Sequence, residues 1–540
     1  MTVEAAAGLS VSGAGDVPGA SEARRRLVDG DVPARLAGKD PSLWGPDAAE
    51  VAKIRLGWLD TFARSRELLP RLTGLREELA AEGVDHVVLA GMGGSSLAPE
   101  VITRTLGVPL TVLDTTDPHQ IARALADRLE RSVVVVASKS GSTVETDSHR
   151  RAYAQAFTDA GIDPGSRLVV VTDPGSPLAE LAEAEGARAV FLADAEVGGR
   201  YSALTAFGLV PSALAGVDVA ELIDQAAALA SSLGDAEDNP ALALGAALGA
   251  ATSGGRDKLA IAGDGSGIVG LGDWIEQLIA ESTGKAGTGI LPVVLETPDS
   301  PGAAGPDVLP ALVGGSLPAA APGSRLLPDG IAVNGPLGAQ FLSWEYATAI
   351  ASAVIGVEPF DQPNVAESKD NTKRLLASGV PAVEPDLVDG AVALYLSGIS
   401  ADSLEAALAA LLAAVPERGY LAVMAYLDRV GDAGIAGLRP MLAGAARRAV
   451  TFGWGPRFLH STGQYHKGGP QHGAFLQITG TVAQDLPVPG RPYSFGQLQA
   501  AQAAGDLQAL AGRDRPVLRL HLTDRATGVA QLLAAAETLG

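Results

Sequence analysis

Short apolar runs that each end in a turn of small residues recur along this chain and restrict the folds open to it. The run 84–89 leads to the turn 91–96, and the run 133–137 leads to the turn 138–143, each followed by a helical pattern. Buried strands that each feed a helix indicate a mostly parallel sheet with helices on both faces. Ligands of such sheets bind at the carboxyl ends of the strands, which is where these turns lie.

The strand-and-turn scheme restarts further along the chain, which predicts several α/β units. Residues 1–50 are rich in Gly, Ala, Pro and Asp and predict a loosely ordered lead-in with one short helix. A Pro/Gly-rich segment over 297–336 interrupts the scheme before a long helix over 338–356. We predict an α/β chain with two doubly wound parallel-sheet domains, at 51–235 and 236–390, and a C-terminal α/β unit at 391–540.

Charge and composition restrict the partners that the chain can have. The 40 Lys and Arg against 62 Asp and Glu give a net charge of −22, which would repel nucleic acid and anionic membranes. We expect no membrane span and no secretory signal, and therefore a cytoplasmic protein. The absence of Cys excludes disulfides, thiolate metal sites and a cysteine nucleophile. Only eight of the cationic residues are Lys, so a Lys inside a Ser-rich turn stands out.

The turn Ser138-Lys139-Ser140-Gly141-Ser142-Thr143 predicts a phosphate site. It places four hydroxyls and one scarce Lys at the start of a helix, which suits a phosphate monoester. It does not fit the nucleotide-triphosphate loop pattern. A Ser/Thr-rich helix cap would explain one hydroxyl but not four. The turn 91–96 is equally well explained as an ordinary strand-to-helix turn.

Two charged residues lie in patterns that suit a cleft. In Gly198-Gly199-Arg200 the glycines permit close backbone approach before a guanidinium, although an Arg paired with nearby carboxylates is the simpler explanation. The helix predicted over 271–283 carries Glu276 away from its apolar stripe, so we expect that carboxylate to be solvated. Glu281 falls at the edge of the stripe near the helix C-terminus, where the dipole would make it more basic. A surface carboxylate is the alternative for Glu281.

Three histidines lie within thirteen residues of the C-terminal unit, at His460, His466 and His472. A spacing of six places them about 120° apart on a helix, so they share no face and a metal site is not expected. The pattern favours a single acid/base histidine.

Five motifs in order along the chain resemble the glucose-6-phosphate isomerase (phosphoglucose isomerase) family. Two departures concern the later motifs: Asn364 and Ala366 stand where the family usually has Gly and Glu, and no His occurs between His149 and His460. The segment 459–465 resembles the family's His-containing segment, so we infer that this element has moved into the C-terminal unit, with His460 as its histidine and His466 as the alternative. The arrangement looks most like the isomerase portion of fused transaldolase–isomerase proteins. The five motifs are 91–95, 138–146, 197–202, 281–285 and 360–369.

The resemblance implies two sugar isomerase (SIS) domains and reversible conversion of glucose 6-phosphate and fructose 6-phosphate, in glycolysis and gluconeogenesis, through a cis-enediol(ate). It implies that Glu281 carries the proton between C2 and C1, that Arg200 stabilises the enediolate, and that His460 and Lys369 serve ring opening. It implies a hexose 6-phosphate as partner and no metal or other cofactor. It also implies a homodimer in which the histidine comes from the neighbouring subunit, although a relocated histidine could act within its own chain. The remaining site residues would be Gln362 for the sugar, Gly94, Ser95, Ser138, Lys139, Ser140 and Thr143 for the phosphate, and Glu145 and Lys285 as supporting neighbours.

Two other functions stay open from the sequence. One is a non-catalytic sugar-phosphate sensor built on the same domains, which would keep the phosphate turns and lose the base, the Arg or the Gln–Lys pair. The other is an isomerase for another hexose phosphate, such as mannose 6-phosphate.

Overall fold

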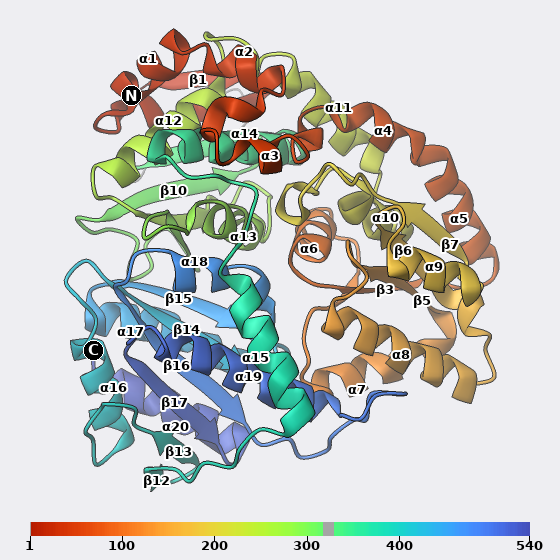
Figure 1. Cartoon of the computed structure of the whole chain (residues 1–540), viewed down its shortest axis with the longest axis vertical. Coiled ribbons are helices and arrows are strands. Elements are labelled where there is room, and N and C mark those ends of the chain that lie inside the picture. The colour runs from red at the N-terminus through yellow and green to blue at the C-terminus, as the bar shows by residue number, and fades with distance from the viewer. Residues whose placement is uncertain (1, 317–328) are drawn as a thin grey trace.

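The computed structural model describes residues 2–316 and 329–540, which form three α/β units, each around one sheet (Figure 1). The first unit holds a sheet in which every pairing is parallel. Its strands, in spatial order, are β4 (Thr111–Leu113), β3 (His86–Gly91), β5 (Ser132–Ala137), β6 (Leu168–Thr172) and β7 (Ala189–Leu192).

Helices cover both faces of the first sheet, which explains why its strands are apolar without alternation. Every residue of β5 is buried. Val133 and Val135 join a core that also contains residues of the second unit, whereas Val134 and Val136 join a separate core on the opposite face. The helices of this unit are α4 (Phe62–Glu67), α5 (Leu69–Ala81), α6 (Leu97–Thr105), α7 (Pro118–Ala126), α8 (Val144–Asp159), α9 (Pro177–Ala184) and α10 (Ala206–Ala215).

The second unit contains a mixed sheet of six strands. Four strands are parallel, and β2 joins them by antiparallel pairing with β11. The strand order is β1 (Val3–Ala6), β2 (Leu9–Ser12), β11 (Ile331–Asn334), β10 (Val308–Gly314), β8 (Lys258–Gly263) and β9 (Leu291–Val294). Its helices are α1 (Ala20–Asp29), α2 (Val32–Ala37), α3 (Ala49–Ala52), α11 (Val219–Ala230), α12 (Pro240–Ser253), α13 (Leu271–Thr283) and α14 (Leu337–Ile355).

The third unit is also built on a mixed sheet of six strands. Its sheet packs over the free face of the second sheet: Ala260 and Ala262 of β8 share a core with Tyr420, Phe458 and Phe475. The strand order is β12 (Leu387–Asp389), β13 (Val392–Tyr395), β17 (Val517–Leu522), β16 (Gly473–Gly480), β14 (Tyr420–Tyr426) and β15 (Ala449–Trp454). The helices from residue 365 onward are α15 (Val365–Ser378), α16 (Leu404–Ala413), α17 (Leu438–Ala446), α18 (Gly463–Gly468), α19 (Phe495–Ala511) and α20 (Arg525–Glu537).

Two segments differ from the sequence-based expectation. In place of a loosely ordered lead-in, the described part of residues 1–50 supplies β1 and β2 to the second sheet and the helix α1 against α12. The Pro/Gly-rich segment 297–336 contains the buried strands β10 and β11, and its residues 317–328 lie outside the described part of the chain. Both contributions depend on pairing partners distant in sequence, which local composition does not show.

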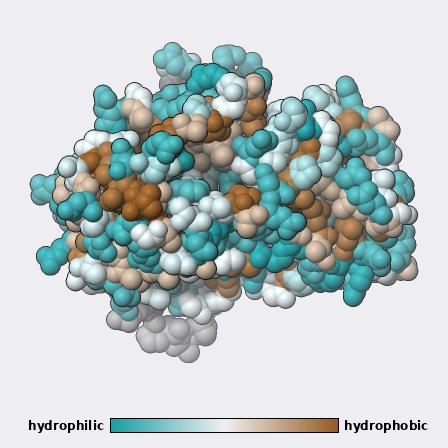
Figure 2. Space-filling model, turned by 90° about the horizontal axis from the view of Figure 1, so that it is seen from below, coloured by the Kyte–Doolittle hydropathy of each residue, from teal (hydrophilic) through white to brown (hydrophobic). Residues whose placement is uncertain are grey.

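The expected fold class, α/β units on largely parallel sheets, is confirmed. The domain boundaries stay a prediction. Within the described residues, no helix is both long enough and apolar enough to cross a membrane. The face in Figure 2 is largely hydrophilic, with separate hydrophobic patches, as expected of a chain with many surface charges.

The buried strand β2 makes a testable contribution to the stability of the fold. Leu9 of β2 is fully buried and Val3 of β1 is 56% exposed. We expect Leu9→Ala to lower the free energy of unfolding by about 2–5 kcal/mol because it leaves a cavity in the core, and Val3→Ala to change it by less than about 0.5 kcal/mol. Urea denaturation followed by circular dichroism measures both. Equal effects of the two variants on the free energy of unfolding would show that β2 does not belong to the folded core.

Candidate active site

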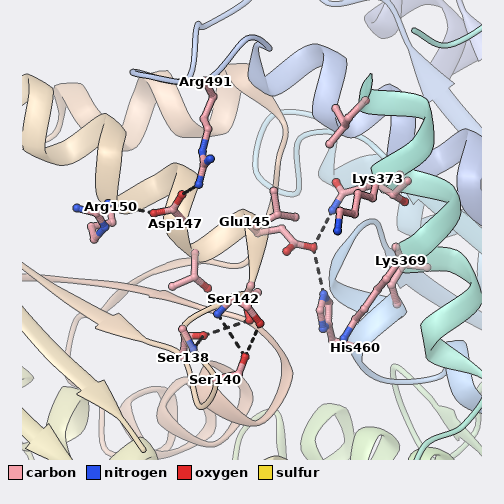
Figure 3. A pocket seen from close by; sticks show the side chains of 18 of the residues that line it. Ser138, Ser140, Ser142, Glu145, Asp147, Arg150, Lys369, Lys373, His460 and Arg491 are labelled. Carbon is pink, nitrogen blue, oxygen red and sulfur yellow. Dashed lines mark hydrogen bonds and ion pairs between the residues drawn. The ribbon is translucent and has the colours of Figure 1, made fainter. Parts of the chain in front are cut away.

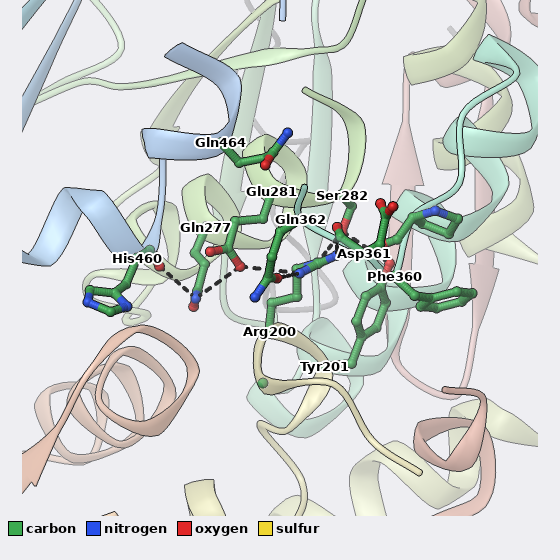
Figure 4. Close-up of polar contacts among 12 residues, drawn as sticks. Arg200, Tyr201, Gln277, Glu281, Ser282, Phe360, Asp361, Gln362, His460 and Gln464 are labelled. Carbon is green, nitrogen blue, oxygen red and sulfur yellow. Dashed lines mark hydrogen bonds and ion pairs between the residues drawn. The ribbon is translucent and has the colours of Figure 1, made fainter. Parts of the chain in front are cut away.

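Arg200 lies buried at the meeting point of the first and second units, where its orientation is fixed. It belongs to the 3-10 helix η7 (Gly199–Tyr201). Its guanidinium donates to Ser282 Oγ at 2.9 Å, to Gln362 Oε1 at 2.5 Å and to two backbone carbonyls in the segment 359–361 at 2.7 and 2.9 Å (Figure 4). The same group lies 3.4 Å from Glu281 Oε2. These contacts aim one positive charge at the Glu281 carboxylate.

Glu281 is buried in the last turn of α13. Burial raises the pKa of this carboxyl above its usual value, although the charges of Arg200, His460 and Lys369 oppose the shift. One turn earlier, Gln277 donates from Nε2 to Glu281 Oε2 at 3.3 Å and to the His460 backbone oxygen at 2.8 Å. A positioned carboxyl with a raised pKa can accept and return a proton near neutral pH.

His460 reaches the same site from the third unit. It ends the 3-10 helix η9 (Arg457–His460), and its Nε2 lies 3.1 Å from Glu145 Oε1. Gln502 of α19 donates to the same Glu145 oxygen at 2.7 Å. Burial tends to raise the pKa of Glu145, but the charge and hydrogen bond of His460, with Lys369 nearby, lower it below its usual value. The ionised Glu145 therefore orients the imidazole through Nε2 and leaves Nδ1 as the free ring nitrogen.

His466 lies in a different environment from His460. Its imidazole packs against the rings of Tyr420, Phe458 and Phe475, and neither ring nitrogen has a hydrogen-bond partner among the described residues. Burial holds the pKa of His466 well below its usual value. The geometry therefore favours His460 over His466 as the histidine of this site.

A cavity of about 750 Å³ adjoins His460 and contains the hydroxyl-rich turn (Figure 3). Ser138 Oγ lies 3.2 Å from Thr143 Oγ1, and the Ser140 and Ser142 hydroxyls are 2.7 Å apart. The turn precedes α8, so the helix N-terminus adds favourable partial charge for an anion. We call residues 138–143 the hydroxyl turn. Its neighbours in the cavity wall include Glu145, Lys369 and His460.

Some predicted site residues have other partners. The Lys139 ammonium is 2.6 Å from Asp173 Oδ2 and is absent from the cavity wall, so its side chain is directed elsewhere. Lys285 donates to Asp361 Oδ1 at 2.6 Å, next to the backbone that Arg200 binds. The roles of these lysines stay predictions.

Gly94 packs against the Arg200 loop, and neither Gly94 nor Ser95 lines the cavity. A Cβ atom built on Gly94 would lie 1.9 Å from the backbone oxygen of Gly199, so no larger residue fits there. Close packing thus explains why position 94 is a glycine. Phosphate binding by Gly94 and Ser95 stays a prediction.

The sequence reasoning missed three groups that shape the site. Gln277 could have been found, because a side chain four residues before Glu281 lies on the same helix face. Ser282, which accepts from Arg200, is adjacent to Glu281 in the recognised motif. Gln502 carries no sequence signal, since α19 reaches Glu145 only through the tertiary fold.

Glu276 is only partly exposed, contrary to the expectation of a solvated carboxylate. The third unit covers its face of α13, and Ser461 Oγ donates to Glu276 Oε1 at 2.8 Å. Burial and the nearby Asp273 raise the pKa of Glu276 to about 8. The amphipathic pattern of one helix could not show that a second unit packs on its polar side.

Arg457 anchors the His460 turn to the first unit. Its Nη1 lies 2.6 Å from Glu100 Oε2 on α6 and 2.8 Å from Asp114 Oδ2 after β4. Burial tends to raise the pKa of Glu100, but Arg457 and Arg429 lower it to about 2. In residues 2–316 and 329–540, no cluster of three or more His, Asp or Glu side chains could hold a metal ion.

The sequence of the first unit and of the start of the second matches a known family. Residues 63–288 match the family model described as phosphoglucose isomerase. This part of the chain belongs to the phosphoglucose isomerase family. The match includes the hydroxyl turn, Arg200 and Glu281, whereas Gln362, Lys369 and His460 lie beyond it. The resemblance to the isomerase portion of fused transaldolase–isomerase proteins stays a prediction.

Relatives of the chain include named isomerases. The glucose-6-phosphate isomerase of Cyanothece sp. is 34% identical over 210 residues, which are 37% of this chain and 40% of that protein. A probable glucose-6-phosphate isomerase of Natronomonas pharaonis is 37% identical over 219 residues, which are 39% and 51% of the two chains. The chain therefore spans about half of these relatives' length or less.

Two solved structures share much of the fold of this chain. A hypothetical protein from Thermus thermophilus has 27% identity and a TM-score of 0.54, covering 67% of this chain and 98% of that one. A glucose-6-phosphate isomerase from Chlamydia trachomatis has 19% identity and a TM-score of 0.54, covering 70% and 90%. The second likeness shows the fold alone.

The raised pKa of Glu276 predicts a pH-dependent stability. Between about pH 4.5 and pH 8 the folded chain keeps a proton on Glu276 that the unfolded chain releases, so this group lowers the free energy of unfolding as pH rises. We expect Glu276→Gln to gain stability relative to wild type across that window, measured by urea denaturation at pH 5, 6.5 and 8. Glu67→Gln, which removes an exposed carboxylate on α4, controls for the loss of one negative charge. A Glu276→Gln difference that is equal at pH 5 and pH 8 would contradict the shift.

Proposed function

We propose that this chain interconverts glucose 6-phosphate and fructose 6-phosphate as an aldose–ketose isomerase of glycolysis and gluconeogenesis. The observation that carries the proposal is the contact of a buried carboxyl of raised pKa, Glu281, with the fixed guanidinium of Arg200. His460, held by Glu145, lies next to this pair through Gln277. The names of the relatives support the same activity.

The chemistry follows from what each group can do at its position. His460 and Lys369 exchange protons with the ring oxygen and hydroxyl, which opens the sugar ring. Glu281 removes the proton from C2 of the open-chain aldose and returns it to C1, while the proton of the C2 hydroxyl passes to the C1 oxygen; the ketose reacts in reverse. Arg200 stabilises the negative charge that develops on the enediolate oxygens. Gln362, which accepts a hydrogen bond from Arg200, orients the sugar next to that charge.

The hydroxyl turn supplies the remote binding energy. In this proposal the hydroxyls of Ser138, Ser140 and Thr143 and the α8 N-terminus bind the phosphate, a part of the substrate that does not react. Binding energy at such a group can hold the reacting carbons in place for proton transfer. A homodimer and a cytoplasmic location, both implied by the family resemblance, complete the proposal.

A sugar-phosphate sensor is less well supported. A sensor needs the hydroxyl turn, but it does not need a base, a guanidinium and Gln362 in mutual contact. Selectivity between glucose 6-phosphate and mannose 6-phosphate depends on the configuration at C2, which these contacts do not address.

Removal of the base tests the activity. We expect wild type to convert fructose 6-phosphate into glucose 6-phosphate in an assay coupled to a glucose-6-phosphate dehydrogenase. We expect Glu281→Gln to lower kcat by about 10²–10⁴-fold, the usual contribution of a general base. Glu67→Gln serves as the control and should keep full activity. An inactive wild type, or a fully active Glu281→Gln, would refute the proposal.

The position of His460 predicts that each chain carries a complete site. His460 contacts Glu145 of its own chain, so a dimer of one Glu281→Gln chain and one His460→Ala chain would contain no intact site. We expect mixtures of the two purified variants, unfolded and refolded together, to stay as inactive as the separate variants. Activity that rises toward a quarter or half of wild type would show that the histidine comes from the neighbouring subunit.

A further inference from the structure

The cavity beside His460 extends past the hydroxyl turn to a second, cationic end. Figure 3 shows Ser138, Ser140 and Ser142 at one end and Arg491 at the other, with Lys369 and Lys373 along the α15 side. Thr143, the N-cap of α8, and Arg151 on α8 lie eight residues apart, or about 12 Å along the helix axis. A molecule that carries two separated anionic groups could therefore pair with both ends at once.

The cationic end is formed by Lys373 of α15, Arg151 of α8 and Arg491 of the segment before α19. We call these three residues the outer cations. Arg151 Nε and Arg491 Nη2 bind Asp147 Oδ2 at 2.8 and 2.7 Å, which preorganises both guanidinium groups around one carboxylate. Nε and Nη1 of Arg491 have no hydrogen bond to the described residues. Arg150 also binds Asp147, through Oδ1 at 3.0 Å, so this carboxylate faces three arginines and the cavity wall keeps an excess of positive charge.

Lys373 adds positive charge that no carboxylate neutralises. Neither Lys373 nor Lys369, one turn earlier on the same helix face, has a hydrogen bond or ion pair with any residue in the described part of the chain, and both line the cavity. Like charges four residues apart destabilise a helix by about 0.2–0.5 kcal/mol. Three of the eight lysines in a chain of net charge −22 line this one cavity, at Lys369, Lys373 and Lys467.

The other charged groups of the cavity wall are already paired or lie apart from this end. Lys467 is 2.7 Å from Asp506, and Arg150 is 2.6 Å from Glu185. Glu145 is bound by His460 and Gln502. Asp370 is an exposed carboxylate on α15 and would oppose an anion in part.

We propose that the outer cations form a second anion subsite, which binds the second phosphoryl group of a sugar bisphosphate whose first phosphoryl group occupies the hydroxyl turn. The inference rests on the proposed function for its assignment of the hydroxyl turn to phosphate. Charge-assisted hydrogen bonds from Arg and an ammonium suit a phosphoryl dianion. A bisphosphate bound across both ends would exclude a hexose monophosphate, so the two ligands compete.

Titration calorimetry with a matched pair of unreactive sugars tests the subsite. The probes are 2,5-anhydromannitol 1,6-bisphosphate and 2,5-anhydromannitol 6-phosphate, which differ by one phosphoryl group and cannot isomerise. We expect wild type to bind the bisphosphate at least about tenfold more tightly than the monophosphate, as one or two charge-assisted contacts would provide. The difference in affinity between the two probes should narrow as salt rises, because Lys373 and Arg491 are exposed to solvent.

A double variant tests whether the outer cations cause this difference in affinity. Lys373→Gln/Arg491→Gln should bind the two probes equally, with an unchanged affinity for the monophosphate that also shows the variant to be folded. The control variant Lys53→Gln/Arg26→Gln removes two exposed charges outside the cavity and should keep the wild-type preference for the bisphosphate. Equal affinity of wild type for the two probes would overturn the inference. So would a double variant that still prefers the bisphosphate, or one that loses affinity for both probes to the same extent.

The coupled assay separates this inference from the proposed function. If the protein turns over fructose 6-phosphate but does not prefer the bisphosphate, the proposed function stands and the second subsite is refuted. A chain that binds neither probe and has no turnover refutes both the hydroxyl-turn assignment and the subsite built on it.

Discussion

The arrangement of the site depends on the buried ion cluster around Arg457. This guanidinium joins Glu100 and Asp114 of the first unit to the turn that ends at His460. Removing one partner from a buried ion pair leaves an uncompensated charge, which costs about 3–5 kcal/mol. Any arrangement that moves the third unit away from the first must therefore separate these charges. The cluster keeps the imidazole next to Glu145, and the shared core of the second and third sheets supports it from the other side.

The features that could be predicted from the sequence are those encoded locally. The strand runs, the hydroxyl turn and Glu281 near the end of α13 each depend on residues within about a dozen positions of one another. The family resemblance added Arg200 and His460, which no periodicity connects. The strand β2, the polar side of α13 and Gln502 could not be predicted, because each depends on contact with a segment more than 100 residues away.

A chain with a net charge of −22 can still bind a negatively charged sugar phosphate, because its charges are distributed unevenly. Interactions between exposed charges weaken beyond about 8–10 Å at physiological salt, so a phosphate inside the cavity responds to the wall and not to the distant surface. That wall contains a helix N-terminus, clustered hydroxyls and unpaired lysines. A net charge thus describes which large partners a protein repels, and much less which small ones it binds.

The pairing of β2 with β11 places a constraint on the order of folding. Ser10 and Asn334 face each other in this ladder, so the first strand leaves the ribosome more than 300 residues before its partner exists. Until then, Leu9 and Val11 have no sheet to cover them, and the hairpin presents an open edge. At about 5–20 residues per second, the delay between the two strands is tens of seconds. The N-terminal hairpin must therefore join the second sheet late in synthesis, and during that interval it is a potential site for chaperone binding or misassembly.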